Sequence, residues 1–334
     1  MNTSKKAVKA LITISLSTSL LVACSDKEEK VTTTTSQNKS SQTQQKEQPP
    51  VQKEVLKQVK NLKQVGGESV ESKFANNDTT SQVAARNGYV YYMYSDTEKT
   101  YVSIADTKKD KWVVKDKLVH QPGADAAIYG TAFMVENTMY FIDEKGEVKK
   151  QVKLPKVNTG LMSDEKEGFI RTNKGDAAYV TTKDMLKLFF EDGTEKEIPM
   201  TDYFSTSSMG DFIDLDKNKA YINDDRYYTM YDLKKGKWVY DENGKQVKNE
   251  KNNSDTVIPF HDYIVKVYGE NNQNRFVYLD EKFKPKQIPE QDFDIVDYKG
   301  LGHFIVEKDT LVYVHMVEFE GKKSVQYMEF KESK

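Results

Sequence analysis

The sequence predicts an all-β protein in which a repeat of four short strands occurs six times. The first observation is a turn residue followed by an apolar or aromatic strand, as in the stretch NGYVYY. The six copies begin at Asn87, Gly130, Asp176, Asn218, Asp262 and Asp309, spaced 43, 46, 42, 44 and 47 residues apart. Asn, Asp and Gly tolerate the backbone conformations that tight turns between antiparallel strands require.

The second observation is a strand that ends on an acidic residue before a turn rich in Lys and Gly. This marker follows later in five of the repeats, at Asp106, Asp143, Asp192, Asp232 and Asp280. An apolar stretch also precedes each turn residue, so each repeat has four strands. Four strands recurring at this period are typical of a β-propeller, in which each sheet packs on its neighbours around a ring. We therefore predict a six-bladed β-propeller of four-stranded antiparallel blades.

The sixth repeat lacks its last strand, because only KESK follows Phe330. The segment Leu62 to Ala75 lies just before the first repeat and has two short strand-like pieces around a Gly-Gly pair. We expect one of them to supply the missing strand and close the ring. The stretch NGYVYYMYSD also distantly resembles the tyrosine-rich strands of six-bladed propeller repeats in bacterial lipoproteins and receptor ectodomains. That resemblance implies the fold and no activity.

Residues 1–23 have the features of a secretion signal. Three lysines precede the apolar stretch Ala10 to Val22, which is too short to span a bilayer with normal flanks. The stretch ends in LVAC, and its Cys24 is the single cysteine of the chain. LVAC resembles the lipobox of bacterial lipoproteins, which implies that Cys24 is lipidated, becomes the mature N-terminus and anchors the protein in the membrane at its outer, extracytoplasmic face. The alternatives are an ordinary signal peptide with a chance cysteine and an uncleaved membrane segment.

The composition changes after this cysteine. Residues 25–54 are dominated by Ser, Thr, Gln and Lys and contain no aromatic residue, so they cannot bury enough apolar surface to order the backbone. We assign residues 24–61 to a flexible linker and residues 62–334 to the propeller. The formal charge of -2 is the remainder of 50 basic and 52 acidic side chains, and it argues against nucleic acid as a partner, which needs a clustered basic surface. The single cysteine excludes an internal disulfide.

Signatures of catalysis are missing: we find no G-x-S-x-G, H-E-x-x-H, P-loop or G-x-G-x-x-G motif, and we assign no catalytic residue and no cofactor. One calcium site is a candidate. Its oxygen ligands would come from Asp214, Asp216, Asn218 and Asp225 of the stretch DLDKNKAYINDD, although Lys219 stands where a calcium loop needs glycine. The alternative is a solvated acidic turn.

A ligand site is predicted at the mouth of the central channel. Two longer connections between repeats place Tyr203, Phe204, Phe293 and Tyr298 among Asp and Ser residues, and amphipathic aromatics beside carboxylates suit sugar or peptide binding. His303 begins an innermost strand and could line the channel, whereas His315 is expected to pack on a strand face. The alternative is that the aromatics only cap their own loops.

These features together predict a membrane-anchored extracytoplasmic lipoprotein that acts as a non-catalytic binding or scaffold module for a protein, peptide or glycan. The alternative is a glycan-active hydrolase or lyase with its site at the channel mouth, since a fold does not determine a function. Clustered carboxylates with strongly shifted pKa values would favour the enzyme. A channel without such a pair would favour the binding module.

Overall fold

The computed structural model describes residues 56–71, 80–95, 99–121, 126–157, 165–202, 211–223, 227–250, 256–270, 273–293, 303–319 and 322–333. All of these lie in Val51–Lys334, the second of two parts into which the chain divides. They form 25 strands, and none of them forms a helix long and apolar enough to cross a membrane. The all-β prediction is confirmed, while Cys24, the signal sequence and most of the predicted linker lie outside the described residues.

The strands follow the predicted repeats. Repeat 1 comprises β2 (Thr80–Arg86), β3 (Tyr89–Ser95), β4 (Thr100–Asp106) and β5 (Lys111–His120). Repeat 2 comprises β6 (Ala126–Ile128), β7 (Ala132–Val135), β8 (Thr138–Ile142) and β9 (Val148–Lys153). Repeat 3 comprises β10 (Lys166–Thr172), β11 (Gly175–Thr181), β12 (Met185–Phe190) and β13 (Glu195–Pro199).

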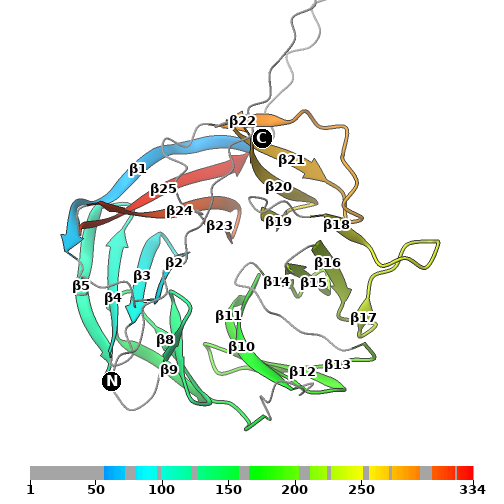
Figure 1. The fold of residues 1–334 in the computed structure, drawn as a ribbon, viewed down its shortest axis with the longest axis horizontal. Coiled ribbons are helices and arrows are strands. Elements are labelled where there is room, and N and C mark those ends of the chain that lie inside the picture. The colour runs from blue at the N-terminus through cyan, green and yellow to red at the C-terminus, as the bar shows by residue number, and fades with distance from the viewer. Residues whose placement is uncertain are drawn as a thin grey trace, which may run out of the picture. The chain divides into compact units, whose positions relative to one another are not determined.

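The second half continues in the same way. Repeat 4 comprises β14 (Phe212–Asp214), β15 (Lys219–Asn223), β16 (Tyr227–Asp232) and two short pieces, β17 (Lys237–Trp238) and β18 (Lys248–Glu250). Repeat 5 comprises β19 (Thr256–Phe260), β20 (Tyr263–Glu270), β21 (Gln273–Leu279) and β22 (Gln291–Phe293). Repeat 6 comprises β23 (His303–Glu307), β24 (Thr310–Phe319) and β25 (Lys322–Glu332). Figure 1 shows the strands of successive repeats following one another around a common centre, with β2, β14, β19 and β23 on the inner side.

The sheets differ from the prediction in one respect. Repeats 1, 2, 5 and 6 are separate four-stranded sheets, but repeats 3 and 4 join into one nine-stranded sheet through a parallel pairing of β10 with β14. The cause lies just beyond β10, where the Asn173 amide donates to the Ile213 carbonyl at 3.1 Å and the Asn173 side chain accepts from the Leu215 amide at 3.0 Å. These two bonds extend the pairing from one repeat to the next.

The fourth strand of repeat 6 comes from the N-terminal side of the domain. Strand β1 (Leu56–Glu71) pairs antiparallel with β25, from Leu56 opposite Glu332 to Glu71 opposite Lys322. The prediction that a segment before the first repeat supplies this strand is therefore confirmed. The strand is continuous through the Gly-Gly pair and starts at Leu56, inside the range that the sequence assigned to the linker.

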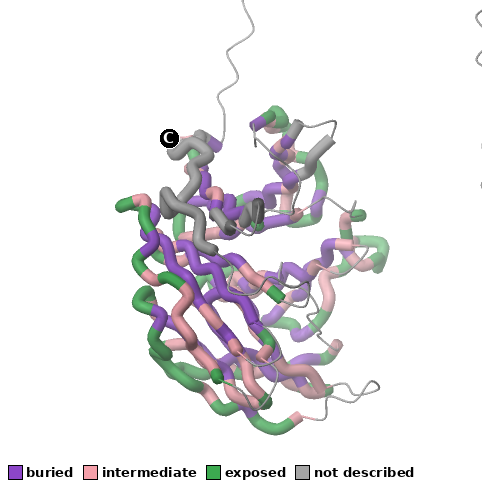
Figure 2. The backbone as a smooth tube through the Cα atoms, turned by 60° about the vertical axis from the view of Figure 1, so that its left-hand side comes forward, coloured by how far each residue is buried: buried purple, intermediate pink, exposed green. Residues whose placement is uncertain are grey.

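Tyrosine-rich strands are buried on both faces because each repeat packs on two neighbours. On β3, Tyr92 and Tyr94 pack with residues of repeat 6 such as Tyr327, whereas Tyr91 and Met93 pack with residues of repeat 2 such as Phe133. Figure 2 shows the resulting bands of buried residues running along the strands, with exposed residues at the strand ends. Burying one such side chain stabilises the fold by about 1.5–3 kcal/mol, so the aromatic strands are the main source of cohesion between repeats.

Polar contacts also join each repeat to the next. In each contact, a side chain or backbone amide of one repeat donates a hydrogen bond to an acceptor in a neighbouring repeat. The donors and acceptors are Arg86 Nη2 and the Ile142 carbonyl, Thr131 Oγ1 and Asp176 (2.6 Å), the Leu215 amide and Asn173 (3.0 Å), Lys217 Nζ and the His261 carbonyl, Gln291 Nε2 and the Leu56 carbonyl (2.5 Å), and the Gly88 amide and Glu307 (2.9 Å). In repeat order these contacts run from 1 to 2, 2 to 3, 3 to 4, 4 to 5, 5 to 6 and 6 back to 1.

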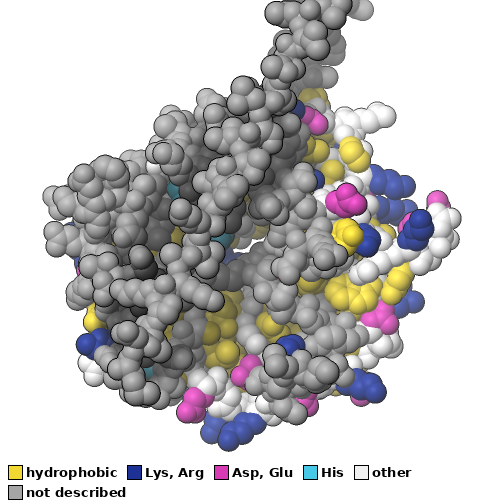
Figure 3. All heavy atoms as spheres, in the orientation of Figure 1, with side chains coloured by type: hydrophobic (Ala, Val, Ile, Leu, Met, Phe, Trp, Pro, Cys, Tyr) yellow, Lys and Arg dark blue, Asp and Glu magenta, His cyan; other side chains and the backbone are white. Residues whose placement is uncertain are grey.

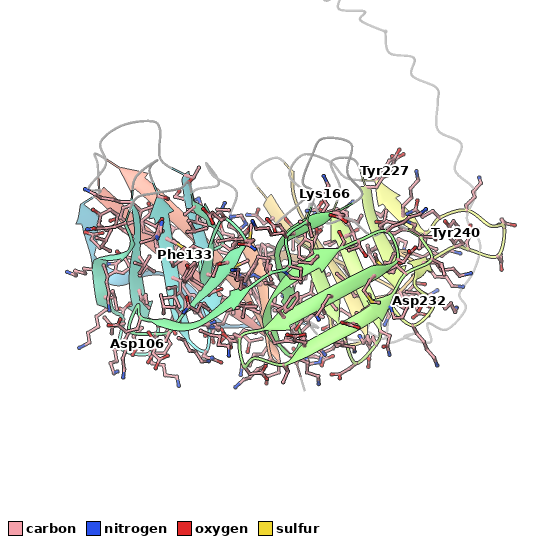
Figure 4. The ribbon with its side chains drawn as sticks, turned by 90° about the horizontal axis from the view of Figure 1, so that it is seen from below. Asp106, Phe133, Lys166, Tyr227, Asp232 and Tyr240 are labelled. Carbon is pink, nitrogen blue, oxygen red and sulfur yellow. The ribbon has the colours of Figure 1, made fainter. Side chains whose placement is uncertain are left out.

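The acidic turn markers have a common structural role. In the β4–β5 turn, Asp106 Oδ1 accepts the backbone amides of Lys108 and Lys109 at 2.9 and 3.1 Å. The equivalent aspartates of repeats 2 to 5, Asp143, Asp192, Asp232 and Asp280, accept the amide two residues later in the same way. Figure 4 shows Asp106 and Asp232 at one face of the domain, with Lys166 and Tyr227 at the other. The carboxylate thus replaces turn hydrogen bonds that the backbone cannot make.

Asp106→Ala is expected to lower the free energy of unfolding by about 0.5–1.5 kcal/mol at pH 7, because two turn amides lose their hydrogen-bond acceptor. Burial would raise the pKa of Asp106, but hydrogen bonds from Lys109 and Lys108 outweigh it and lower the pKa. Its stabilising effect is therefore present above the unfolded-state pKa and is lost as the pH falls through the folded-state value. Urea titrations of the variant and the wild type between pH 7 and 3 measure this.

Glu144→Ala is the matched control for Asp106→Ala, because Glu144 is an exposed acidic residue of the corresponding turn in repeat 2. It should change the free energy of unfolding by less than about 0.5 kcal/mol. A difference between Asp106→Ala and the wild type that does not shrink in acid would contradict the assigned role of the carboxylate.

Candidate functional site

A cavity of about 580 Å³ lies between the first strands of repeats 1, 3, 4, 5 and 6. Its lining comes from β2, β10, β14, β19 and β23, the turns that follow β2, β10 and β23, and residues of β11 and β15 and of the turn after β12, including Asp176, Asn223 and Glu191. This volume falls within the usual range for small-ligand pockets. The outer surface differs in character: Figure 3 shows Lys and Arg side chains interspersed with Asp and Glu along the described part of the rim. The cavity is accordingly the best candidate site in the described part of the chain.

Arg86, the last residue of β2, is held by acidic residues of repeat 3. Its guanidinium lies 2.7 Å from Glu191 and 3.5 Å from Asp176, and it also contacts the ring of Tyr91. Asp176 in turn accepts the hydroxyl of Thr131 at 2.6 Å. All three charged side chains are largely buried, with exposed fractions of 15%, 11% and 20% for Arg86, Asp176 and Glu191. This cluster joins repeats 1, 2 and 3 at one end of the cavity.

The other two acidic residues of the lining are also held by the protein. Asp211 accepts the backbone amide of Asn223 at 2.7 Å, and Glu307 accepts the amide of Gly88 at 2.9 Å. Burial raises the pKa of Glu307, and the hydrogen bond from Gly88 opposes this shift. Every carboxylate that lines the cavity therefore has a protein donor.

Arg171 on β10 differs from Arg86. Its neighbour across the β10–β11 hairpin is Asp176, whose carboxylate is already occupied by Arg86 and Thr131. Among the described residues, no hydrogen bond or ion pair reaches the Arg171 guanidinium. Burial lowers the pKa of Arg171 and the charge of Arg86 adds to the effect, while Asp176 and Glu307 oppose it. Arginine stays charged under these conditions, so Arg171 adds a positive charge to the cavity wall.

Of the two predicted ligand residues that the structure describes, His303 lines the cavity and Phe293 does not. His303 begins β23, as expected, and its side chain is exposed there. Loss of hydration in the cavity lowers the pKa of His303 from its ordinary 6.5, and the charges of Arg171 and His315 lower it further. The imidazole is therefore neutral at pH 7. His315 itself is buried, with 7% exposed, in agreement with its predicted packing role.

The predicted aromatic residues of the channel mouth are described only in part. Tyr203, Phe204 and Tyr298 lie outside the described residues. Phe293 ends β22 and is buried, with 7% exposed, and its ring stacks on Phe276 at 4.1 Å between centroids. The ring of Phe293 is thus occupied by contacts within the core.

Three of the four calcium candidates are described, and Asp225 is not. Asp214 accepts the amides of Asp216 and Lys217, and Asp216 forms an ion pair with Lys174 at 2.8 Å. Asn218 adopts a φ of 53°, as its place in the turn before β15 requires. No group of three or more His, Cys, Asp or Glu side chains in the described ranges could hold a metal ion. The calcium site, which includes an undescribed residue, stays a prediction.

Sequence reasoning did not single out Arg86 and Arg171. A usable signal is present, because each arginine directly follows the apolar residues of a first strand, in QVAAR and GFIR. Because the first strands line the cavity, a charged residue near the end of such a strand lies at the cavity wall.

No protein-family model matches this chain, and no curated protein matches it. Solved structures of similar fold include a DUF4623 family protein from Bacteroides eggerthii, with a TM-score of 0.40, 10% identity and coverage of 85% of this chain and 78% of that one. They also include the WD40 domain of Toxoplasma gondii coronin (TM-score 0.38, 11% identity, 84% and 87% coverage). A protein of unknown function from Bacteroides caccae is similar too (0.32, 13%, 70% and 93%). The strand order of the chain defines an all-β protein with propeller-like antiparallel sheets.

Proposed function

We propose that the protein is a lipid-anchored, extracytoplasmic binding module, built as a closed six-bladed propeller, that takes part of a protein, peptide or glycan ligand into its central cavity. The observation that carries this proposal is the state of the cavity carboxylates. Glycosidases need one carboxyl group as an acid and a second as a base or nucleophile. Here all four acidic side chains of the lining accept hydrogen bonds or form ion pairs within the protein. This favours binding over the alternative hydrolase or lyase.

The closed ring is supported by the polar contacts between successive repeats and by β1. The contacts link each repeat to the next, and the contact between Gly88 and Glu307 links the last repeat to the first. Strand β1 completes the sheet of repeat 6 without a disulfide. A ring closed in this way holds the cavity walls in a fixed geometry, which lowers the entropic cost of binding.

Lipid anchoring is supported by the LVAC stretch and by the single cysteine of the chain. Cys24→Ser is expected to abolish acyl labelling and to prevent processing by the lipoprotein signal peptidase, because the sulfur that would carry the lipid is missing. Fractionation of cells that express the variant or the wild type measures this. Unchanged acyl labelling of the variant would contradict the anchor.

Ligand binding in the cavity is tested with the anchored protein, released from membranes in mild detergent and examined by native mass spectrometry after incubation with envelope extract. We expect a bound species on the wild type. His303→Trp should reduce its occupancy, because the larger indole fills part of the cavity next to β23. A wild type that binds nothing would overturn the proposed binding function.

A further inference from the structure

Strand β1 contains the same four residues twice. The stretch LKQV begins at Leu56 and again at Leu62, within the sequence LKQVKNLKQV. The two copies start six positions apart, and a strand that slips by an even number of residues keeps its alternation of faces. The second copy therefore fits the place that the first copy occupies against β25.

The first copy is held at the junction of repeats 5 and 6. Leu56 is fully buried in a core that also contains Phe276 and Phe330. Its backbone amide donates to Gln291 Oε1 at 3.3 Å, and its carbonyl accepts from Gln291 Nε2 at 2.5 Å. The hydroxyl of Tyr278 donates to the same Oε1 at 3.0 Å and so fixes the orientation of the amide. This site requires a leucine side chain and the backbone groups of one residue, and Leu62 offers both.

The pairing of β1 with β25 is irregular in the observed register. Strand β1 has 16 residues and β25 has 11, although their ends lie opposite each other, so five residues of β1 have no place in a regular ladder. The register shifts between Gln58 and Lys60, between Lys60 and Lys63, and between Val65 and Val70. Each shift interrupts the ladder of backbone hydrogen bonds.

A slipped register removes these interruptions. With Leu62 opposite Glu332, residues 62–71 pair one to one with residues 332–323. At the far end of the strand, Glu71 moves only from Lys322 to Lys323, so the connection to β2 hardly changes. The slip releases residues 56–61 from the sheet and gains an uninterrupted ladder, so the two registers compete. The slipped strand begins at residue 62, which is the boundary between linker and propeller that the sequence predicts.

We propose that β1 closes the ring in two registers, one that begins at Leu56 and one that begins at Leu62. The exchange changes the length of the segment before the domain by six residues, which is about 20 Å at roughly 3.3 Å per residue, while the sheet of repeat 6 stays complete. In a lipid-anchored protein this segment is the tether, so the domain can move away from the membrane without losing its closing strand. The role of the tether rests on the proposed lipid anchor, whereas the two registers do not.

Disulfide trapping in the full chain with Cys24→Ser separates the registers, because introduced cysteines are then the only thiols. The observed pair, Lys57→Cys with Lys331→Cys, places two thiols opposite each other in the observed register. The slipped pair, Lys63→Cys with Lys331→Cys, does so only after the slip. In the observed register Lys63 is opposite Tyr327, four residues from Lys331, which exceeds the reach of a disulfide. We expect both pairs to form intramolecular disulfides in a glutathione redox buffer.

Lys63→Cys with Lys323→Cys is the control pair, since these two positions are opposite each other in neither register, and it should stay reduced. Adding Leu56→Ala should raise the yield of the slipped pair relative to the observed pair by about tenfold or more, because the observed register then loses its buried leucine. Leu62→Ala should lower the same ratio. Trypsin should cleave after Lys60 when the slipped pair is oxidised and should not do so when the observed pair is oxidised.

Two patterns of oxidation would overturn the inference. In the first, the slipped pair stays reduced, whether or not the observed pair oxidises. In the second, the control pair oxidises as far as the slipped pair, which would mean that β1 detaches from β25 rather than slips along it. Because Cys24→Ser carries no acyl chain, neither result depends on the lipid anchor, which acyl labelling of the wild type tests separately.

Discussion

Deleting residues 25–71 from the mature chain is expected to abolish cooperative folding or to lower the melting temperature by about 10 °C or more. The deletion removes β1, the strand that pairs with β25 along its length and completes repeat 6. It also removes Leu56, a fully buried member of the core between repeats 5 and 6, and truncating such a leucine alone costs about 2–5 kcal/mol. The freed edge of β25 would be open to pairing with other molecules.

Deleting residues 25–55 is the matched comparison, because it ends immediately before Leu56. This shorter deletion should leave the melting temperature nearly unchanged. Thermal melts of the two truncated proteins beside the mature protein, with light scattering to follow aggregation, separate the two outcomes. If both truncations melt together, β1 is not part of the ring and the count of six blades fails with it.

The features that sequence predicts best are those set by local chemistry. The turn residues and the acidic markers recur because each repeat needs the same two turns, and Asp106 accepts amides only two and three residues away. The sequence also predicts a strand before the first repeat, because the last repeat lacks its fourth strand and needs one from elsewhere in the chain. Its start at Leu56 was missed because Leu56 is buried by repeats 5 and 6, far along the chain.

The chemistry of the cavity depends on contacts that local patterns do not contain. Arg86 and Glu191 are 105 positions apart, and nothing near either residue predicts their pairing. Phe293 was predicted at the channel mouth from its polar neighbours in sequence, yet its ring stacks on Phe276 of the adjacent strand. The parallel link between repeats 3 and 4 depends on Asn173, which reads as an ordinary turn residue. Such features depend on contacts between repeats rather than on the pattern within one repeat.

Arg86→Met is expected to lower the free energy of unfolding by about 3 kcal/mol, because it leaves the largely buried Asp176 without its cation and Glu191 with only the ion pair to Lys149 at 3.7 Å. Asp176 and Glu191 have exposed fractions of 11% and 20%, so water cannot replace the guanidinium well. The variant also loses the bond from Arg86 to the Ile142 carbonyl, which joins repeats 1 and 2. Urea titration at pH 7 gives the loss directly.

Two further variants separate the buried charge from the general cost of losing an arginine. Adding Asp176→Asn and Glu191→Gln to Arg86→Met removes the unpaired charges and should recover much of the loss, because neutral amides cost less to bury than carboxylates. Arg275→Met breaks an exposed pair with Glu290 and Asp292 and should cost less than about 1 kcal/mol.

The destabilisation of Arg86→Met should also shrink below pH 5, since unpaired buried carboxylates titrate at a raised pKa and folding is favoured once they are protonated. Equal losses in Arg86→Met and Arg275→Met would mean that the cluster at the cavity does not hold repeats 1, 2 and 3 together.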